Sequence, residues 1–397
     1  MESSNIIHQP AYSLADLTKY FLTLGTFGFG GPVALVGYMH RDLVEQRKWI
    51  SEEEYREGLA LAQLAPGPLA AQLSIYLGFV HYGLWGATLI GLAFVLPSFV
   101  MVVLLGIAYK LYGGLSWMQA VFYGVGAAVI GIIGLSAYKL TLKSIGKFQW
   151  AEMKSRWLLW LFYLSMAIVT ALTQREEVWL FVILGFVYMA IKAPPQWLKR
   201  KKPVLSLSVV LLAGIGFWEY EPDKLVQIGW FFTKAGAFVF GSGLAIIPFL
   251  QTGVVHELGW LNEQQFLDAV AVAMITPGPV VITVAFIGFL VAGFAGAVVA
   301  ALGVFFPCYI FTVLPAPYFK KIAKNASIKA FVDGITAAVV GALVGAVIVI
   351  GIRSITDIPS ALIAIASVLA LLYIKKLQEP YIILIAAVLG LALKSFV

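Results

Sequence analysis

The sequence has few charged residues and a single cysteine. Of its 397 residues, 12% are charged and 61% are hydrophobic, whereas a soluble domain carries about 25% charged residues. This composition excludes an ordinary soluble protein and predicts a polytopic membrane protein. The lone Cys308 excludes an intrachain disulfide and a cysteine-rich metal site, and we expect it to pack as a small apolar side chain.

The sequence also lacks the usual motifs of enzymes and ATP-driven pumps. Its four histidines have no metal-ligand spacing, and no Gly-x-x-x-x-Gly-Lys-Ser/Thr phosphate loop is present. No Ser/His pair stands at motif spacing. We therefore expect no metal, no cofactor, no enzymatic activity and no direct coupling to ATP. Residues 1–16 are polar and lack the pattern of a cleaved signal peptide, so none is expected.

Long apolar runs are what the sequence does contain. Residues 83–108 and 330–352 are continuous examples, whereas a β-barrel would show short segments of alternating polarity. The predicted fold class is an all-α polytopic membrane protein. The net charge of +7 lies mostly between the apolar runs, where it indicates topology rather than nucleic-acid binding.

The chain repeats itself. An offset of 211 residues aligns three landmarks without a gap, and one deletion then aligns two more: Gly25 with Gly236, Trp49 with Trp260, Pro66-Gly67-Pro68 with Pro277-Gly278-Pro279, Gly83 with Gly293, and Pro97 with Pro307. The sequence therefore predicts an N-terminal repeat at 1–200, a linking transmembrane helix within 201–218 and a C-terminal repeat at 219–397.

Each half contains apolar helices that break at glycine and proline. A Pro-Gly-Pro sequence cannot continue a helix, although proline suits the first turn of a new one. In the first half we expect two helical hairpins, made of residues 13–29 with 33–45 and of 51–65 with 69–82. Four full spans follow at about 83–111, 117–140, 157–173 and 178–192. Ser51 and the three glutamates after it are a strong helix start.

The distribution of lysine and arginine predicts that the two halves are inverted. If residues 204–218 span the membrane, the clusters at 41–48, 139–156, 199–202, 320–329 and 375–376 all fall on the cytoplasmic side. Only Arg353 and Lys394 fall outside. If that segment lies on the surface instead, the inversion fails. Inverted repeats with interrupted helices are typical of secondary transporters, which bind substrate at the midplane where the repeats meet.

Four helix N-termini should therefore converge near residues 31, 67, 243 and 278. Their free N–H groups and positive dipole ends favour an anion, and neutral polar side chains beside the breaks suit an oxyanion that must also leave. Breaks of this kind can also be structural kinks. The predicted substrate-binding residues are Thr26, Gly30, Gly31, Gln63, Gly67, Gln72, Ser242, Gly243, Thr276 and Gly278.

Five charged residues are further candidates at the mouth of the site or in ion coupling. Lys19 and Lys234 lie near the start of matching half-helices, where they attract anions or only snorkel. Arg41 and Arg47 either gather substrate or form an ordinary interfacial basic rim. Glu57 is a candidate for proton coupling if it faces a cavity, with a solvated acid as the alternative.

These motifs resemble those of the chromate ion transporter family, in its long form with two fused halves. The resemblance covers nearly the whole chain and depends on Phe29-Gly30-Gly31-Pro32, residues 62–68 with Gln72, residues 240–243, and residues 276–279. It implies a multi-pass inner-membrane protein that exports chromate and confers resistance to it. Ser242-Gly243 replaces Gly31-Pro32 and Met274 replaces Gln63, so the two halves need not be equivalent.

Three alternatives for function stay open at this point. The first is a secondary transporter of chromate or a related tetrahedral oxyanion. The second is a carrier of sulfate or another anion that takes chromate by mimicry. The third is a passive anion channel. The lipid bilayer and the oxyanion are the expected partners, with no nucleic acid, and a homodimer is possible.

Overall fold

The computed structural model describes residues 12–29, 31–113, 115–173, 178–195, 223–238, 243–319, 325–355, 357–374 and 377–394. These residues form helices and the turns between them, with no β-strand among them, so the all-α prediction is confirmed. Within these ranges, four helical segments are long and apolar enough to cross a membrane: Leu69–Tyr112, Ser116–Ser144, Val280–Tyr318 and Ala326–Ser354.

The first half contains two broken helices, two long helices and a shorter pair. Its elements in chain order are α1 (Leu14–Phe27), α2 (Gly31–Met39), the π-helix η1 (His40–Gln46), α3 (Glu52–Leu64), α4 (Leu69–Tyr112), α5 (Ser116–Ser144), α6 (Trp150–Ser155), α7 (Trp157–Thr173) and α8 (Val178–Lys192). The predicted helix boundaries agree with these to within a few residues. The predicted linking helix at 204–218 lies outside the described residues.

The second half repeats most of this order. It contains α11 (Lys224–Ala237), η2 (Gly243–Ile246), α12 (Ile247–Gln251), η3 (Thr252–Glu257), α13 (Glu263–Ile275), η4 (Val280–Ile282), α14 (Thr283–Val313), η5 (Ala316–Tyr318), α16 (Ala326–Ser354), α17 (Ile358–Tyr373) and α18 (Glu379–Lys394). As in the first half, a π-helix follows the first break, and a 13-residue helix precedes the Pro-Gly-Pro turn.

Capping boxes start both helices that lead into the Pro-Gly-Pro turns. Ser51 and Glu54 bond reciprocally at the start of α3, and Asn262 and Gln265 do the same at the start of α13. Both turns contain a glycine with positive φ, +144° at Gly67 and +97° at Gly278, which side chains rarely adopt. The sequence places the breaks correctly because proline and glycine determine them locally.

A second break divides the long helix after each turn. The backbone leaves the helical region at Tyr82 and Gly83 in α4, and at Ala292 and Gly293 in α14. The two glycines have nearly the same dihedral angles, φ +61° with ψ −150° and φ +63° with ψ −153°. Residues at matching positions of the two halves therefore have matching local structure.

Helices from the two halves pack in antiparallel pairs. At one end of the α4–α14 contact, the hydroxyls of Thr88 and Tyr309 lie 3.0 Å apart. Towards the other end, Gly106 of α4 faces the ring of Phe289 of α14. Because residue numbers rise along one helix as they fall along the other, these two matching helices run in opposite directions, as an inverted repeat requires.

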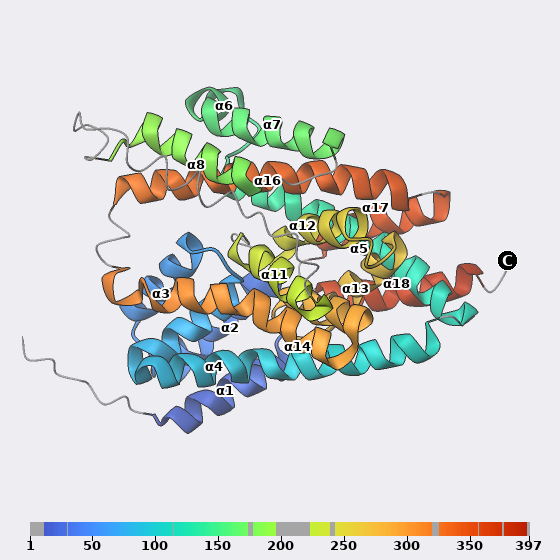
Figure 1. The fold of residues 1–397 in the computed structure, drawn as a ribbon, viewed down its shortest axis with the longest axis horizontal. Helices are drawn as coiled ribbons and strands as arrows, with labels where there is room; N and C mark the ends of the chain where they lie inside the picture. The colour runs from blue at the N-terminus through green and yellow to red at the C-terminus, as the bar shows by residue number, and fades with distance from the viewer. Residues whose placement is uncertain are drawn as a thin grey trace, which may run out of the picture.

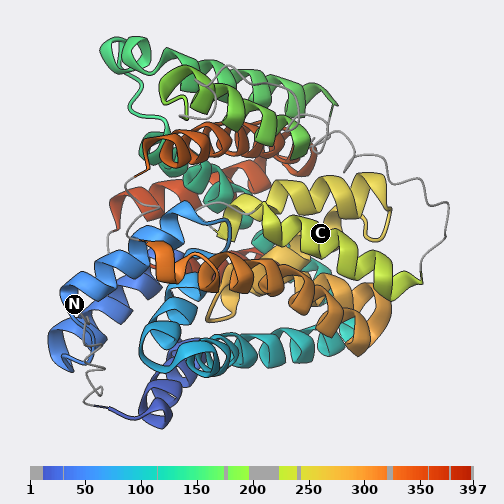
Figure 2. The same cartoon turned by 60° about the vertical axis from the view of Figure 1, so that its left-hand side comes forward.

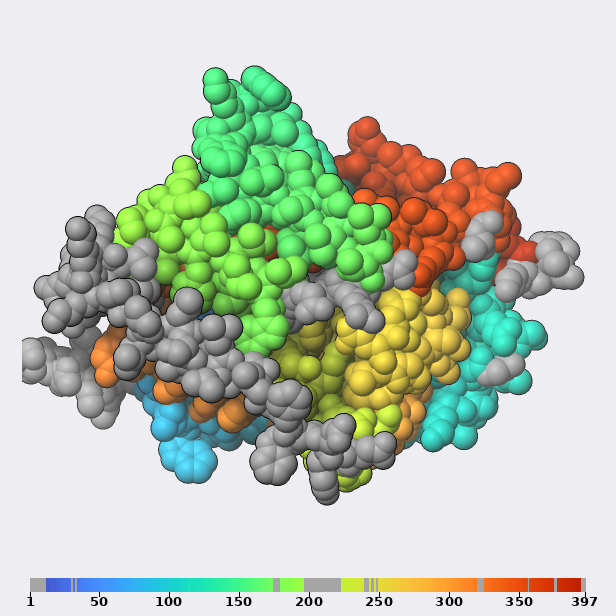
Figure 3. Space-filling view, turned by 45° about the horizontal axis from the view of Figure 1, so that its top comes forward, coloured from blue at the N-terminus to red at the C-terminus, as the bar shows by residue number. Residues whose placement is uncertain are grey.

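The last two helices of each half pack on the other half. α7 and α8 pack against α16, and α17 and α18 pack against α5. Figure 1 shows α7 and α8 above α16, with α4 and α14 along the opposite side of the molecule. The same grouping is visible after rotation in Figure 2, and Figure 3 shows α6 and α7 projecting as a ridge. This exchange joins the halves into one body.

Large apolar side chains cover much of the outer surface. On α4 alone Leu84, Leu92 and Leu104 are each more than half exposed. Exposed apolar surface of this extent marks contact with a membrane rather than with water. The buried residues form two large clusters, one centred on α1, α3 and the first part of α4, and one on α11, α13 and α14.

We predict that Gly86→Ala destabilises the protein, because a Cβ there would lie 2.1 Å from the backbone oxygen of Gly78. Overpacking of this kind costs about 1–3 kcal/mol. The measurement is the thermal unfolding midpoint of the detergent-solubilised protein. Gly37→Ala is the control, because no atom lies within 4 Å of its Cβ position. Equal midpoints for the two variants would contradict the close approach at this kink.

Candidate functional site

A cavity of about 990 Å³ lies where helix breaks from both halves meet. It is bounded by the C-terminal end of α5 and the N-terminal end of α16. These two ends lie side by side because the two helices run in opposite directions. Its lining includes Gly28, Gly31, Pro32, Gln63, Leu69, Ser136, Lys139, Lys143, Arg156, Met274, Thr276, Gly278, Val280, Lys329, Asp333, Thr336 and Glu379.

Hydrogen bonds hold the second-half Pro-Gly-Pro turn against the first half. The N–H of Gly278 donates to the carbonyl oxygen of Gly28 at 3.0 Å. The hydroxyl of Ser98, on α4, donates to the carbonyl oxygen of Pro277 at 2.7 Å. The Gly278 turn and the Gly28 turn are therefore fixed to each other at the wall of the cavity.

Helix N-termini reach this wall from three breaks. α2 begins at Gly31, α4 begins at Leu69, and η4 begins at Val280, and each of these residues lines the cavity. No side chain caps α4 or η4 at Pro68 or Pro279. First-turn N–H groups of a helix have no partner within the helix, so this wall can bind an anion.

Basic side chains complete the cavity. Lys139 and Lys143 of α5, Arg156 before α7, and Lys329 of α16 line it, against the two carboxylates of Asp333 and Glu379. None of the four basic groups has an ion-pair partner among the described residues. The arrangement therefore leaves an excess of positive charge available to a ligand.

Four of the predicted substrate-binding residues line the cavity, namely Gly31, Gln63, Thr276 and Gly278. Gln63 is exposed within it. The hydroxyl of Thr276 donates to the carbonyl oxygen of Val272 at 2.6 Å, which leaves its oxygen able to accept but not to donate elsewhere. Two other predicted residues, Gly30 and Ser242, lie outside the described residues.

The remaining predicted binding residues lie away from the cavity wall. Gln72 is fully buried, and its amide nitrogen donates to the carbonyl oxygen of Pro66 at 2.8 Å, which stabilises the first Pro-Gly-Pro turn. Gly67 packs against Gln72 and Cys308. The hydroxyl of Thr26 donates to Leu22 within its own helix, and Gly243 packs against Val281.

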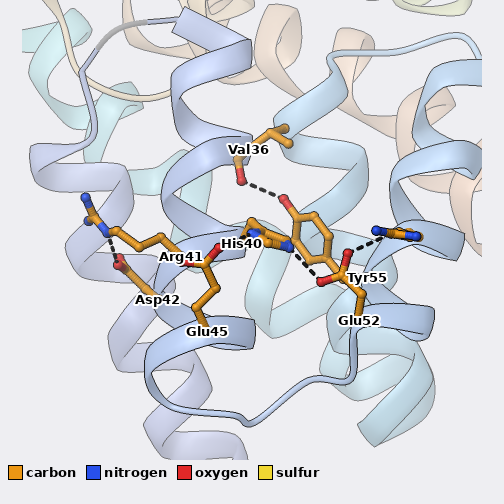
Figure 4. Close-up of polar contacts among 8 residues, drawn as sticks. Val36, His40, Arg41, Asp42, Glu45, Glu52 and Tyr55 are labelled. Carbon is orange, nitrogen blue, oxygen red and sulfur yellow. Dashed lines mark hydrogen bonds and ion pairs between the residues drawn. The ribbon is translucent and has the colours of Figure 1, made fainter.

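The charged mouth candidates also lie outside the cavity lining. Arg41 bonds Asp42 at 2.8 Å, and Arg47 lies over the rings of Tyr20 and Trp49. The Nζ atom of Lys234 lies 5.8 Å from the centre of the Trp230 ring. Lys19 is exposed, and Glu57 is partly buried on α3. Figure 4 shows the group around Arg41 as a local network.

That network ties η1 to α3. The ring of His40 contacts Glu45 at 3.1 Å and Glu52 at 2.8 Å, and the hydroxyl of Tyr55 donates to the carbonyl oxygen of Val36 (Figure 4). The hydrogen bond from His40 lowers the pKa of the Glu52 carboxyl. These contacts stabilise the first hairpin.

Sequence reasoning missed the basic residues of the cavity because it counted them only as topology signals. The spacing of Ser136, Lys139, Leu140 and Lys143 places them on one face of α5. A polar stripe of this kind within a span of otherwise apolar residues was the available signal. The same spacing places Lys329, Asp333 and Thr336 on one face of α16. Arg156 could not be assigned in this way, because it lies before α7 and reaches the cavity only through packing.

Comparison with known proteins gives a consistent result. The sequence profile of the chromate transporter family matches residues 15–190 and 226–391. A chromate transport protein of Cupriavidus metallidurans is 62% identical over 96% of this chain and 94% of its own length. A probable chromate transport protein of Synechococcus elongatus is 59% identical over 98% of both chains.

A more distant relative extends the comparison. A chromate transport protein of Pseudomonas aeruginosa is 30% identical over 96% of this chain and 92% of its own length. No solved structure matches the chain significantly. The similarity thus covers both halves of the molecule and the helices that bound the cavity.

We predict that the cavity is open to water. The background is Cys308→Ser, which removes the one native thiol; serine is already present at the matching first-half position, Ser98. In this background Thr336→Cys should react rapidly with a charged thiol reagent. Ser74→Cys should not, because Ser74 is fully buried. The measurement is the rate of labelling in membranes. Labelling of Thr336→Cys as slow as that of Ser74→Cys would contradict a cavity open to water.

Proposed function

The chain belongs to the chromate transporter family, and from that premise we propose that it is a secondary transporter that carries chromate out of the cell across the inner membrane. The observation that supports this most directly is the cavity at the meeting point of the broken helices, with its four basic side chains. Export of chromate would confer resistance to it.

The chemistry of the cavity suits a tetrahedral oxyanion. Chromate presents four oxygens, so donors arriving from several directions can bind it at once. Helix N-termini approach from three breaks, and lysines and an arginine approach from α5, α16 and the start of α7. Fixed dipoles and charges of this kind offset the cost of removing an anion from water.

The charge distribution along the chain supports a cytoplasmic opening. Lys139, Lys143 and Arg156 belong to the cluster that the positive-inside rule assigns to the cytoplasm, and so does Lys329. These are the basic residues of the cavity. On this topology the cavity opens towards the cytoplasm and collects oxyanions there.

The membrane potential favours export of such a substrate. Moving one elementary charge across the membrane is worth about 2.3 kcal/mol per 100 mV, so a dianion leaving a negative interior gains about 4.6 kcal/mol. Export of a dianion therefore needs no ATP. It requires only that the site bind the anion from inside and release it outside.

The affinity must stay moderate for release to occur. Three of the four basic groups are lysines, which present a compact charge on a flexible stem, whereas arginine forms rigid bidentate pairs with oxyanions. Two carboxylates, Asp333 and Glu379, further reduce the positive field. This composition favours a substrate that enters, is held and leaves.

We predict that Lys143→Gln raises the KM for chromate efflux by about threefold to tenfold, because it removes one unit charge from the cavity. The measurement is flux in proteoliposomes loaded with chromate. Lys154→Gln is the matched control, since Lys154 is exposed on α6 outside the cavity. An unchanged KM would rule out this site. Inhibition of chromate flux by sulfate at the same concentration as chromate would indicate a sulfate carrier. Chromate flux that never saturates would indicate a channel.

We also predict that efflux is driven by voltage. A potassium diffusion potential that makes the vesicle interior negative should accelerate chromate efflux, because about 4.6 kcal/mol per 100 mV acts on two exported charges. The rate is compared at zero and at imposed potential, with the same internal chromate. If the rate of chromate efflux is independent of the potential but rises with external sulfate, the transport is electroneutral exchange. That result would contradict transport of the dianion alone.

A further inference from the structure

A second cavity, of about 640 Å³, lies at the opposite end of α5 and α13 from the first. It is lined by residues from the end of α4, the start of α5 and the start of α13, among them Tyr109, Lys110, Gln119, Tyr123 and Asp268. More of its lining is polar than apolar, which is unusual beside helices whose outer surfaces are apolar.

A dry segment separates the two cavities. On α5, residues 124–133 are all buried and are glycine, alanine, valine or isoleucine. On α13, residues 269–273 lie between Asp268 of the second cavity and Met274 of the first, and all are buried alanine or valine. Tyr123 lines the second cavity and Ser136 lines the first, so at 1.5 Å per residue the separation along α5 is about 20 Å.

The two cavities therefore lie on one line along α5 and α13, with a plug of small apolar side chains between them. The plug is thin in places, because Gly126 faces Leu267 without a side chain of its own. α13 carries the plug and leads directly into the Pro-Gly-Pro turn at the first cavity.

The cavities differ in charge. The first has four basic side chains and two carboxylates, whereas the second has one of each, Lys110 and Asp268. Asp268 is 3% exposed and accepts hydrogen bonds from the hydroxyl of Tyr109 at 2.7 Å and from the amide of Gln264 at 2.8 Å. Both partners are neutral donors, and they hold the carboxyl group at the cavity wall.

The residue of the first half that matches Asp268 lies outside the lining of the first cavity. Glu57 aligns with Asp268 at the offset of 211 residues, yet Glu57 does not line the first cavity. Asp268 therefore lines the second cavity, whereas Glu57 lies outside the lining of the first cavity, which holds the basic cluster. This difference is not expected from the repeat alone.

We propose that the second cavity is the outer vestibule through which the oxyanion leaves, and that Asp268 keeps the affinity of this vestibule for oxyanions low. The proposal rests on the function proposed above. Lys110 admits the anion once the plug opens, and the fixed carboxylate repels it, so the anion does not stay or return. The membrane potential supplies the driving force for export, and the weak release site outside limits rebinding of the exported anion.

Asp268→Asn tests this proposal. In right-side-out vesicles at external pH 8, external molybdate serves as a tetrahedral dianion that competes for the vestibule. Asp268→Asn should lower the molybdate concentration that half-inhibits chromate efflux by on the order of tenfold. Lys110→Gln should raise it. The KM for internal chromate should stay unchanged in Asp268→Asn.

Two controls keep the result specific. Glu257→Gln removes an exposed carboxylate of η3 on the same side of the hairpin and should leave inhibition by molybdate unchanged. Asp268→Glu retains the charge and should behave like the wild type. If Asp268→Asn transports chromate with unaltered inhibition by molybdate, the proposal is wrong while the proposed function stands. If the wild type moves no chromate, the proposed function itself fails.

A second measurement covers the case in which Asp268→Asn does not fold. In the Cys308→Ser background, Gln119→Cys places a thiol in the vestibule without altering Asp268. A cationic thiol reagent added outside should react at least threefold faster than an anionic one of similar size. Equal rates, or faster reaction of the anionic reagent, would contradict the repulsive field, and no reaction from outside would contradict the vestibule.

Discussion

A helix that stops inside an apolar environment leaves backbone groups without partners, and the rest of this structure depends on how they are satisfied. In lipid an unsatisfied N–H or carbonyl costs several kcal/mol. Some are bonded internally, by Gln72 to Pro66 in one half and by Ser98 to Pro277 across the halves. Those that remain, in the first turns that face the cavity, are what an anion can use. The broken helices thus supply both the fold's main constraint and the proposed binding site.

Much of the fold could be predicted because its signals are local. Proline and glycine determine the breaks, Ser51 and its glutamates determine a helix start, and the repeat in sequence reappears as matching dihedral angles at Gly83 and Gly293. The exchange of helix pairs could not be predicted. Whether α7 packs on α5 or on α16 depends on complementary surfaces, which hydrophobic periodicity does not specify.

The same limit explains the site. Gly31 and Gly278, predicted from local breaks in the chain, line the cavity. Gln72 has the right chemistry and lies beside a break, but its helix turns it into the protein, where it stabilises the turn. Lys329 and Arg156 reach the cavity through tertiary packing. Charge near a membrane surface has two meanings, topology and binding, and only packing distinguishes them.

Matching residues of the two halves have different surroundings, and such a difference is what the proposed opening on one side requires. Lys143 of α5 lines the first cavity, whereas Arg353, its counterpart on α16, bonds Glu263 at 2.8 Å near the start of α13. One end of the repeat thus holds its basic residue in an ion pair while the other exposes it. If the halves exchanged roles during transport, Lys143 would need a carboxylate partner at its own end. Asp333 and Glu379 line the same cavity and could supply one, so closing the inner side would replace the substrate's negative charge with the protein's own.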